Sequence, residues 1–262
     1  MQILREILEK LASGTISVDE AEKELKFDIV EKVTRVARLD VARELRRGVP
    51  EIVFGEGKSV EDLIAISARM LEKNRRAILT RVDSIQLAGL ETRFEGKGEI
   101  RKFPHSKSVV IKRADFESRQ TGGRVGILTA GTVDLAVAED AEMIANEMGC
   151  STYLEADAGV AGIHRLVEPL RNLIKNDVDS LIVVAGREGA LPTVVAGLVD
   201  IPLIAVPASS GYGYGGGGRA ALMAMLQACS LGLAVVNIDS GIAAGVVAAQ
   251  IANRVAKARS GN

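Results

Sequence analysis

A cysteine that follows a glycine-rich segment is the most reactive pattern in this chain. The segment runs from Ser209 to Gly218 and holds six glycines, and Cys229 stands eleven residues after its end. Glycine tolerates positive φ and lets the backbone come close to a ligand. In one interpretation the thiol is a soft nucleophile that faces a bound substrate. In the other, Cys229 is a small buried apolar residue at a helix end, because free cysteines are among the most buried residues.

Other polar residues stand where expected strands give way to helices. The turn 129–132, Thr-Ala-Gly-Thr, offers backbone N–H groups to an anion, or is simply a tight turn. His164 begins a helix and lies either on the helix surface or in a cleft. Glu188 follows Arg187 and precedes a glycine, so its carboxylate either caps the next helix or acts as a base.

The elements that must position these residues alternate regularly after Gly123. The apolar pattern predicts five strands, at 124–129, 152–155, 180–184, 203–206 and 234–238. It predicts helices at 134–148, 163–174, 191–198, 219–228 and 242–256. Strands that are apolar on both sides, such as 181–184, are typical of central parallel strands. We therefore expect a doubly wound parallel α/β domain over 121–262, with ligands bound at the carboxyl ends of the strands.

The first 120 residues follow a different pattern and predict a small α+β domain over 1–120. Apolar residues recur at helical spacing over 3–11, and Ser17 with Glu20 forms a candidate capping box for a second helix. Strands are expected at 51–54 and 76–81, with a helix between them that Ser59 caps. The alternation over 94–112 predicts a β-hairpin.

Composition excludes several classes of protein. The net charge of −1 gives no general attraction for nucleic acid or for anionic lipid. Two cysteines give no disulfide framework. No uncharged run reaches the ~20 apolar residues of a membrane span, and the charged amphipathic start is not a signal peptide. We therefore expect a cytoplasmic protein without nucleic-acid or membrane partners.

The motifs together resemble the LarB family, the pyridinium-3,5-biscarboxylic acid mononucleotide synthases of nickel-pincer-nucleotide biosynthesis. The C-terminal domain of that family is similar to PurE, the aminoimidazole ribonucleotide carboxylase/mutase. The matching runs are GILTAGTVD, EADAGVAGIHRL, VVAGREGALPTVVAGLVDIPLIAVP, GYG with further glycines, and CSLGLAVVNIDSG, together with RLDVARELRRGVPEIVFGEGKS and AILTR. They cover most of the chain.

The resemblance implies an activity. The family carboxylates the pyridinium ring of nicotinic acid adenine dinucleotide at C5, with CO₂ or bicarbonate as co-substrate, and hydrolyses the phosphoanhydride to release AMP. It implies no tightly bound organic cofactor, is compatible with Mg²⁺, and implies a homo-octamer. Two alternatives remain, namely a PurE-like mutase and a non-catalytic regulator that senses nucleotides.

The resemblance also implies roles for particular residues. Those with expected catalytic roles are Cys229, Glu188, Asp157 and His164. Those expected to bind substrate are Thr129, Gly131, Thr132, Asp134, Arg165, Gly186, Arg187, Gly211, Tyr212, Gly213, Gly217 and Asp239. The chain departs from the family pattern at several positions, namely Val133, Ala136, 208–210, Ser240, Ile242, Ala243 and Arg187, where a methionine is expected.

The implied chemistry suits these residue types. A pyridinium ring is electron-poor and does not attack CO₂. Addition of a thiolate at C4 makes C5 the nucleophilic carbon of an enamine, and loss of the C5 proton and of the thiolate then restores the aromatic ring. This scheme needs a reversible soft nucleophile, which Cys229 supplies, and a base, for which Glu188 is the candidate.

Overall fold

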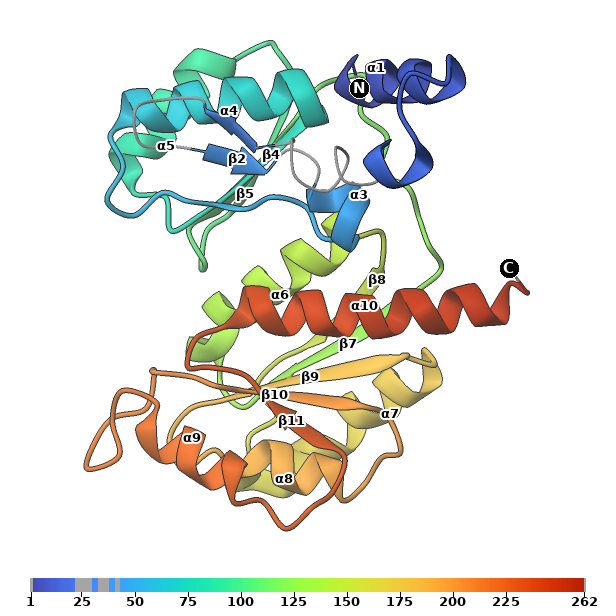
Figure 1. Cartoon of the computed structure of the whole chain (residues 1–262). Helices are drawn as coiled ribbons and strands as arrows, with labels where there is room; N and C mark the ends of the chain where they lie inside the picture. Colours follow the sequence, from blue (N-terminus) through green and yellow to red (C-terminus); the bar gives the residue numbers. More distant parts are fainter. Residues whose placement is uncertain (1, 22–29, 33–37, 41–42, 262) are drawn as a thin grey trace. The chain divides into compact units, whose positions relative to one another are not determined.

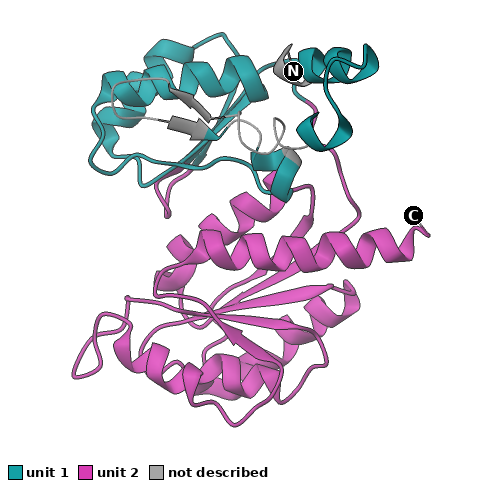
Figure 2. Ribbon diagram, viewed as in Figure 1, with its two compact units in different colours: residues 1–102, 109–116 teal, residues 103–108, 117–262 magenta. Residues whose placement is uncertain are grey.

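The computed structural model describes residues 2–21, 30–32, 38–40 and 43–261. The chain divides into two compact units (Figures 1 and 2). The first comprises Met1–Lys102 and Val109–Phe116, and the second comprises Phe103–Ser108 and Glu117–Asn262.

The first unit is a small α+β fold. Its elements are α1 (Gln2–Ala12), β1 (Val30–Lys32), β2 (Arg38–Asp40), α3 (Arg43–Arg47), β3 (Val53–Phe54), α4 (Val60–Asn74), β4 (Arg76–Thr80), α5 (Ser84–Phe94), β5 (Glu99–Phe103) and β6 (Ser108–Lys112). Four strands pair in the order β3-β4-β6-β5, and β1 pairs with β2. Buried side chains of α4, among them Leu63 and Ile66, pack with β4 in one apolar core. The expected capping box at Ser17 is present, because its hydroxyl accepts the Glu20 N–H and its own N–H donates to the Glu20 carboxylate. Ser59 caps α4 as expected, because its hydroxyl accepts the Asp62 N–H at 3.1 Å.

Helix α5 was absent from the sequence expectations. Its signal is Asp83, whose carboxylate accepts the N–H groups of Ile85 and Gln86 at 2.9 and 2.8 Å, while Gln86 accepts the N–H of Asp83. This is a capping box with Asp and Gln in place of Ser and Glu. Leu87, Leu90 and Phe94 then recur at helical spacing and pack on the core, so the sequence did contain the signal for this helix.

The second unit alternates strands and helices. Its elements are β7 (Arg124–Thr129), the 3₁₀ turn η1 (Thr132–Asp134), α6 (Leu135–Glu147), β8 (Ser151–Glu155), the 3₁₀ segment η2 (Val160–Leu166), α7 (Val167–Lys175), β9 (Ser180–Ala185), α8 (Ala190–Ala196), β10 (Leu203–Pro207), α9 (Arg219–Leu226), β11 (Leu233–Val235) and α10 (Gly241–Arg259). The expected helix at 163–174 is wrong at its start, because Gly162 leaves helical geometry at φ −138° and ψ 78° and the α-helix begins only at Val167.

The second unit is the expected doubly wound α/β fold. Its five parallel strands run in the order β11-β10-β9-β7-β8. Helices α6 and α10 lie on one face of the sheet, and α7, α8 and α9 lie on the other (Figure 1). The order reverses between β7 and β9, because β7 continues to β8 on one side while β9 continues to β10 on the other. Open α/β sheets bind ligands at such a switch point.

Close packing of α10 on α6 depends on a glycine. A Cβ built at Gly245 would lie 2.3 Å from Ile144 Cγ2 and 2.6 Å from the carbonyl oxygen of Ala141. We predict that Gly245→Ala lowers the free energy of unfolding by about 1–3 kcal/mol, because overpacking must separate the two helices. Urea unfolding measures this effect. Arg254→Ala, an exposed change on the same helix, is the control, and equal stability of Gly245→Ala and wild type would contradict the packing.

No helix among the described residues is long and apolar enough to cross a membrane.

Candidate functional site

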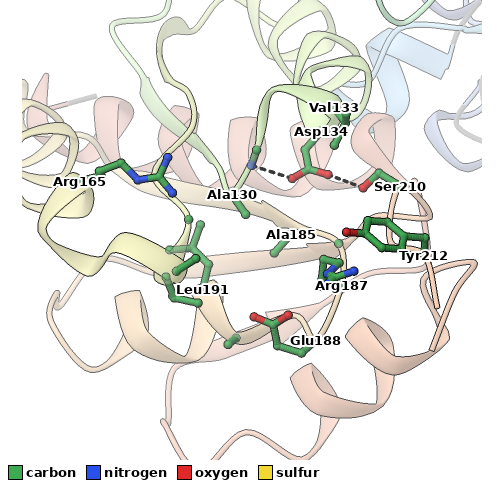
Figure 3. Close-up of a pocket in the computed structure, with 16 residues that line it drawn as sticks. Ala130, Val133, Asp134, Arg165, Ala185, Arg187, Glu188, Leu191, Ser210 and Tyr212 are labelled. Carbon is green, nitrogen blue, oxygen red and sulfur yellow. Dashed lines mark hydrogen bonds between the residues drawn. The ribbon is translucent and has the colours of Figure 1, made fainter. Parts of the chain in front are cut away.

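A pocket of about 310 Å³ lies at the switch point, at the carboxyl ends of β7 and β9. Its size is at the lower end of the roughly 300–1,000 Å³ typical of small-molecule sites. Apolar walls come from the turn after β7, the start of η2 and the first turn of α8. The lining residues are Ala130, Gly131, Val133, Asp134, Gly159, Val160, Ala161, Arg165, Ala185, Gly186, Arg187, Glu188, Ala190, Leu191, Ser210 and Tyr212 (Figure 3).

Asp134 is the buried carboxylate of this pocket, with 2% of its surface exposed. The Gly131 N–H donates to its Oδ2 at 3.0 Å, and the Ser210 hydroxyl bonds to its Oδ1 at 2.6 Å (Figure 3). Burial raises the pKa of the Asp134 carboxyl, and the Asp239 carboxylate adds to the rise, while the hydrogen bonds from Ser210 and Gly131 oppose it. Asp134 therefore ties the turn after β7 to the loop after β10.

The raised pKa of Asp134 predicts a pH-dependent stability difference. The folded protein binds this proton more tightly than the unfolded chain, so the free energy of unfolding falls as pH rises through the usual carboxyl range and beyond it. We predict that Asp134→Asn, which stays neutral, gains stability relative to wild type between pH 4 and pH 7. Urea unfolding of both proteins across this pH range measures the stability difference. The exposed substitution Asp200→Asn is the control. A difference that does not vary with pH would contradict the assignment.

Arg165 lines the pocket, and Asp157 lies outside the lining as its ion-pair partner. Their side chains pair at 3.1 Å between Arg165 Nη1 and Asp157 Oδ2. Asp157 has φ +58°, and its N–H donates to the Thr129 hydroxyl at 3.3 Å. Thr129 is fully buried, so it supports the Asp157 turn and does not line the pocket. His164 lies exposed on η2, also outside the lining.

Arg187 and Glu188 follow β9 and both line the pocket. Helix α8 is capped by Gly189 without a side-chain bond, so the alternative that Glu188 caps this helix is wrong. Glu188 makes no hydrogen bond to a described residue, and its carboxylate lies beside the cavity, near Leu191 and Arg187 (Figure 3). The guanidinium of Arg187 lies 4.2 Å from the ring centroid of Tyr212.

Two glycines let the loop after β9 touch the loop after β10. A Cβ at Gly186 would lie 2.5 Å from the Ser210 hydroxyl, and a Cβ at Gly211 would lie 2.5 Å from the Arg187 nitrogen. Asp239 anchors the same loop, because its carboxylate accepts the Ser209 N–H at 2.8 Å. Gly211 and Asp239 thus support the loop after β10, although neither lines the pocket. Gly213 and Gly217 have positive φ in the same loop.

Cys229 lies away from this pocket within one chain. It is exposed, so the alternative of a buried apolar cysteine is wrong. Helix α9 ends at Leu226 and β11 begins at Leu233. The neighbouring Gly232 carbonyl accepts the N–H of Leu203, the first residue of β10. Cys229 therefore lies at the amino ends of the strands, and a five-residue strand such as β10 spans roughly 13–17 Å.

The structure brings seven of the sixteen expected site residues into the pocket, namely Gly131, Asp134, Arg165, Gly186, Arg187, Glu188 and Tyr212. The others lie outside its lining, namely Thr129, Thr132, Asp157, His164, Gly211, Gly213, Gly217, Cys229 and Asp239. Sequence reasoning missed Ser210, the partner of Asp134. The sequence did hold a sign of it, because the segment Ala208-Ser209-Ser210 follows a strand and departs from the family pattern.

The described residues contain no group of three or more His, Cys, Asp or Glu side chains placed to hold a metal ion. Asp134 already uses both carboxylate oxygens in hydrogen bonds.

Comparison with known proteins matches both halves of the chain. Residues 30–113 match the family described as LarB/PurE-like N-terminal domain, and residues 124–259 match AIR carboxylase. The chain belongs to the LarB family. An uncharacterized protein of Methanocaldococcus jannaschii is 42% identical over 254 residues, which cover 95% of this chain and 96% of that protein.

This LarB-family chain is also similar to a PurE-type enzyme. The N5-carboxyaminoimidazole ribonucleotide mutase of Methanocaldococcus jannaschii is 35% identical over 127 residues, which cover 48% of this chain and 76% of that enzyme. The order of domains, the parallel sheet and the pocket at its switch point agree with a carboxylase/mutase-type enzyme with a PurE-like domain.

Proposed function

We propose that this protein carboxylates the pyridinium ring of nicotinic acid adenine dinucleotide and hydrolyses its phosphoanhydride, giving pyridinium-3,5-biscarboxylic acid mononucleotide and AMP. The observation that supports the proposal is a pocket lined by Glu188, which we take as the base, and by the cation Arg187, in a chain whose N-terminal domain matches that of the LarB family. The pocket volume suits one nucleotide half of this substrate.

The ring chemistry follows from the electron deficiency of the pyridinium. The Cys229 thiolate adds at C4, and the electron pair moves into the ring to form an enamine. C5 attacks CO₂, Glu188 takes the C5 proton, and expulsion of the thiolate restores aromaticity. The net change replaces C5–H by C5–carboxylate and releases one proton, and a water molecule is consumed separately when the phosphoanhydride is cleaved.

This scheme needs Cys229 to come from a second copy of the chain, because within one chain the thiol lies at the other end of the strands. The surroundings of Cys229 suit such a contact. Leu226 is 66% exposed and Leu231 is 91% exposed, on either side of the thiol, and Met223 and Leu198 are exposed as well. Exposed apolar patches of this kind mark interfaces. We propose a homo-oligomer, with the octamer as the expected size, in which this surface meets the pocket of a neighbour.

The direct test incubates the full chain with nicotinic acid adenine dinucleotide and ¹³C-bicarbonate and detects products by mass. The proposal predicts a doubly carboxylated mononucleotide with one ¹³C, and AMP in equal amount. The same assay with aminoimidazole ribonucleotides tests the PurE-like mutase. Turnover of an aminoimidazole ribonucleotide, or tight dinucleotide binding without any product, would overturn the proposal in favour of the mutase or of the nucleotide sensor.

A further inference from the structure

The loop between β10 and α9, residues 208–218, forms part of the pocket wall and then leaves it. Ser210 and Tyr212 line the cavity. Tyr214 is not among the lining residues, and its side chain is fully exposed. Two residues of extended chain span at most roughly 7 Å. The ring of Tyr214 therefore stands within reach of the pocket mouth.

Both ends of this loop are fixed to the rest of the second unit. At the first end, the Ser209 N–H donates to the Asp239 carboxylate at 2.8 Å. At the second end, a Cβ on Gly218 would lie 2.6 Å from Ile238 Cγ2, so the chain there is packed too closely for any side chain. The loop is thus anchored immediately before and after its glycine-rich middle.

The middle of the loop is free of such packing. Gly213 and Gly217 have φ of +87° and +70°, and a Cβ at either position would meet nothing within 4 Å. The Gly216 N–H donates to the Gly213 carbonyl oxygen at 3.0 Å, which closes a turn with Tyr214 at its first corner. Because glycine adopts either sign of φ, rotation at these positions can move the turn and its tyrosine.

We infer that Tyr214 binds the second base of a dinucleotide by stacking on it outside the pocket. This inference rests on the proposed function, because a cavity that suits one nucleotide half leaves the other half beyond the mouth. Tyr212 has the Arg187 guanidinium over its ring, 4.2 Å from the centroid, whereas the Tyr214 ring is open to solvent. An aromatic side chain stacks on any base, because every base presents a π-face.

The first test measures binding of nicotinic acid adenine dinucleotide and of nicotinic acid mononucleotide by calorimetry, without bicarbonate. Tyr214→Ala is expected to weaken dinucleotide binding roughly 5- to 150-fold, the usual contribution of one stacked base, and to leave mononucleotide binding unchanged. Tyr214→Phe keeps the ring and is expected to keep the affinity. Ile85→Ala, which truncates another exposed apolar side chain, on α5, is the control.

A second test uses fluorescence, because the sequence contains no tryptophan. In Tyr214→Trp, the dinucleotide is expected to quench the indole emission, because the stacked base contacts the ring directly. The mononucleotide has no second base and is expected to leave the emission unchanged. Ile85→Trp, on the first unit, is the control, and neither ligand should change its emission.

Unchanged dinucleotide binding in Tyr214→Ala would overturn the inference. Equal losses for both ligands would make Tyr214 a cover of the pocket, an equal loss in Tyr214→Phe would assign the contact to the hydroxyl, and a changed oligomeric state in light scattering would make Tyr214 a contact between copies. Each of these results also contradicts stacking on a base. Failure of the proposed function is distinct, because it appears as missing product in the mass assay, whereas the base contact is measured without turnover. A wild type that binds neither ligand would overturn both.

Discussion

Cys229→Ser is expected to reduce carboxylation by on the order of 10⁴-fold or more, because removal of a covalent nucleophile is among the largest losses a single substitution causes. A hydroxyl is a much weaker nucleophile than a thiolate at neutral pH. The side chain is exposed and nearly equal in size to serine, so the fold and the oligomeric state should be retained. Single-turnover assays with mass detection measure the loss.

Cys150 is the matched control for this substitution. Burial raises the pKa of the Cys150 thiol to about 11, so it stays protonated at neutral pH. Its Sγ lies 3.2 Å from the Asn253 Oδ1 in the packed interior. Cys150→Ala is expected to keep the carboxylation rate. Near-normal turnover in Cys229→Ser would show that the covalent mechanism is wrong.

Glu188→Gln is expected to lower kcat by roughly 10²- to 10⁴-fold, the usual contribution of a general base. Glutamine has the same shape and cannot take the C5 proton, so substrate affinity should change little. The carboxylated adduct on Cys229 should then accumulate, and intact-protein mass spectrometry would detect it. Glu168→Gln, an exposed change on α7, is the control. A large rise in KM with unchanged kcat would instead make Glu188 a binding residue.

The sequence predicted the alternation of the second unit well, because strands buried on both faces leave unbroken apolar runs such as 181–184. The strand order was not predicted, since periodicity does not say which strands are neighbours. The pocket residues after β7 and β9 were found because ligands collect at strand ends. The Arg187–Tyr212 stack was missed, because it joins two loops whose contact depends on Gly186 and Gly211.

The position of Cys229 in the fold could have been predicted from the order of the elements around it. The residue follows a helix and precedes a strand, and in a parallel sheet that connection lies at the amino ends of the strands. The pocket residues follow strands, and so they lie at the other edge. Within one chain, Cys229 and Glu188 therefore lie at opposite edges of the sheet and cannot reach the same substrate ring. The proposed mechanism thus requires a site that two copies of the chain share.

Mixing two inactive variants tests this account most directly. Cys229→Ser and Glu188→Gln are unfolded, combined in equal amounts, refolded together and assayed with nicotinic acid adenine dinucleotide and bicarbonate. If each site takes its thiol from one copy and its base from another, random assembly restores about a quarter of wild-type carboxylation. Each variant refolded alone stays inactive, and refolded wild type sets the scale. Activity in the mixture no higher than that of the separate variants would contradict the shared site.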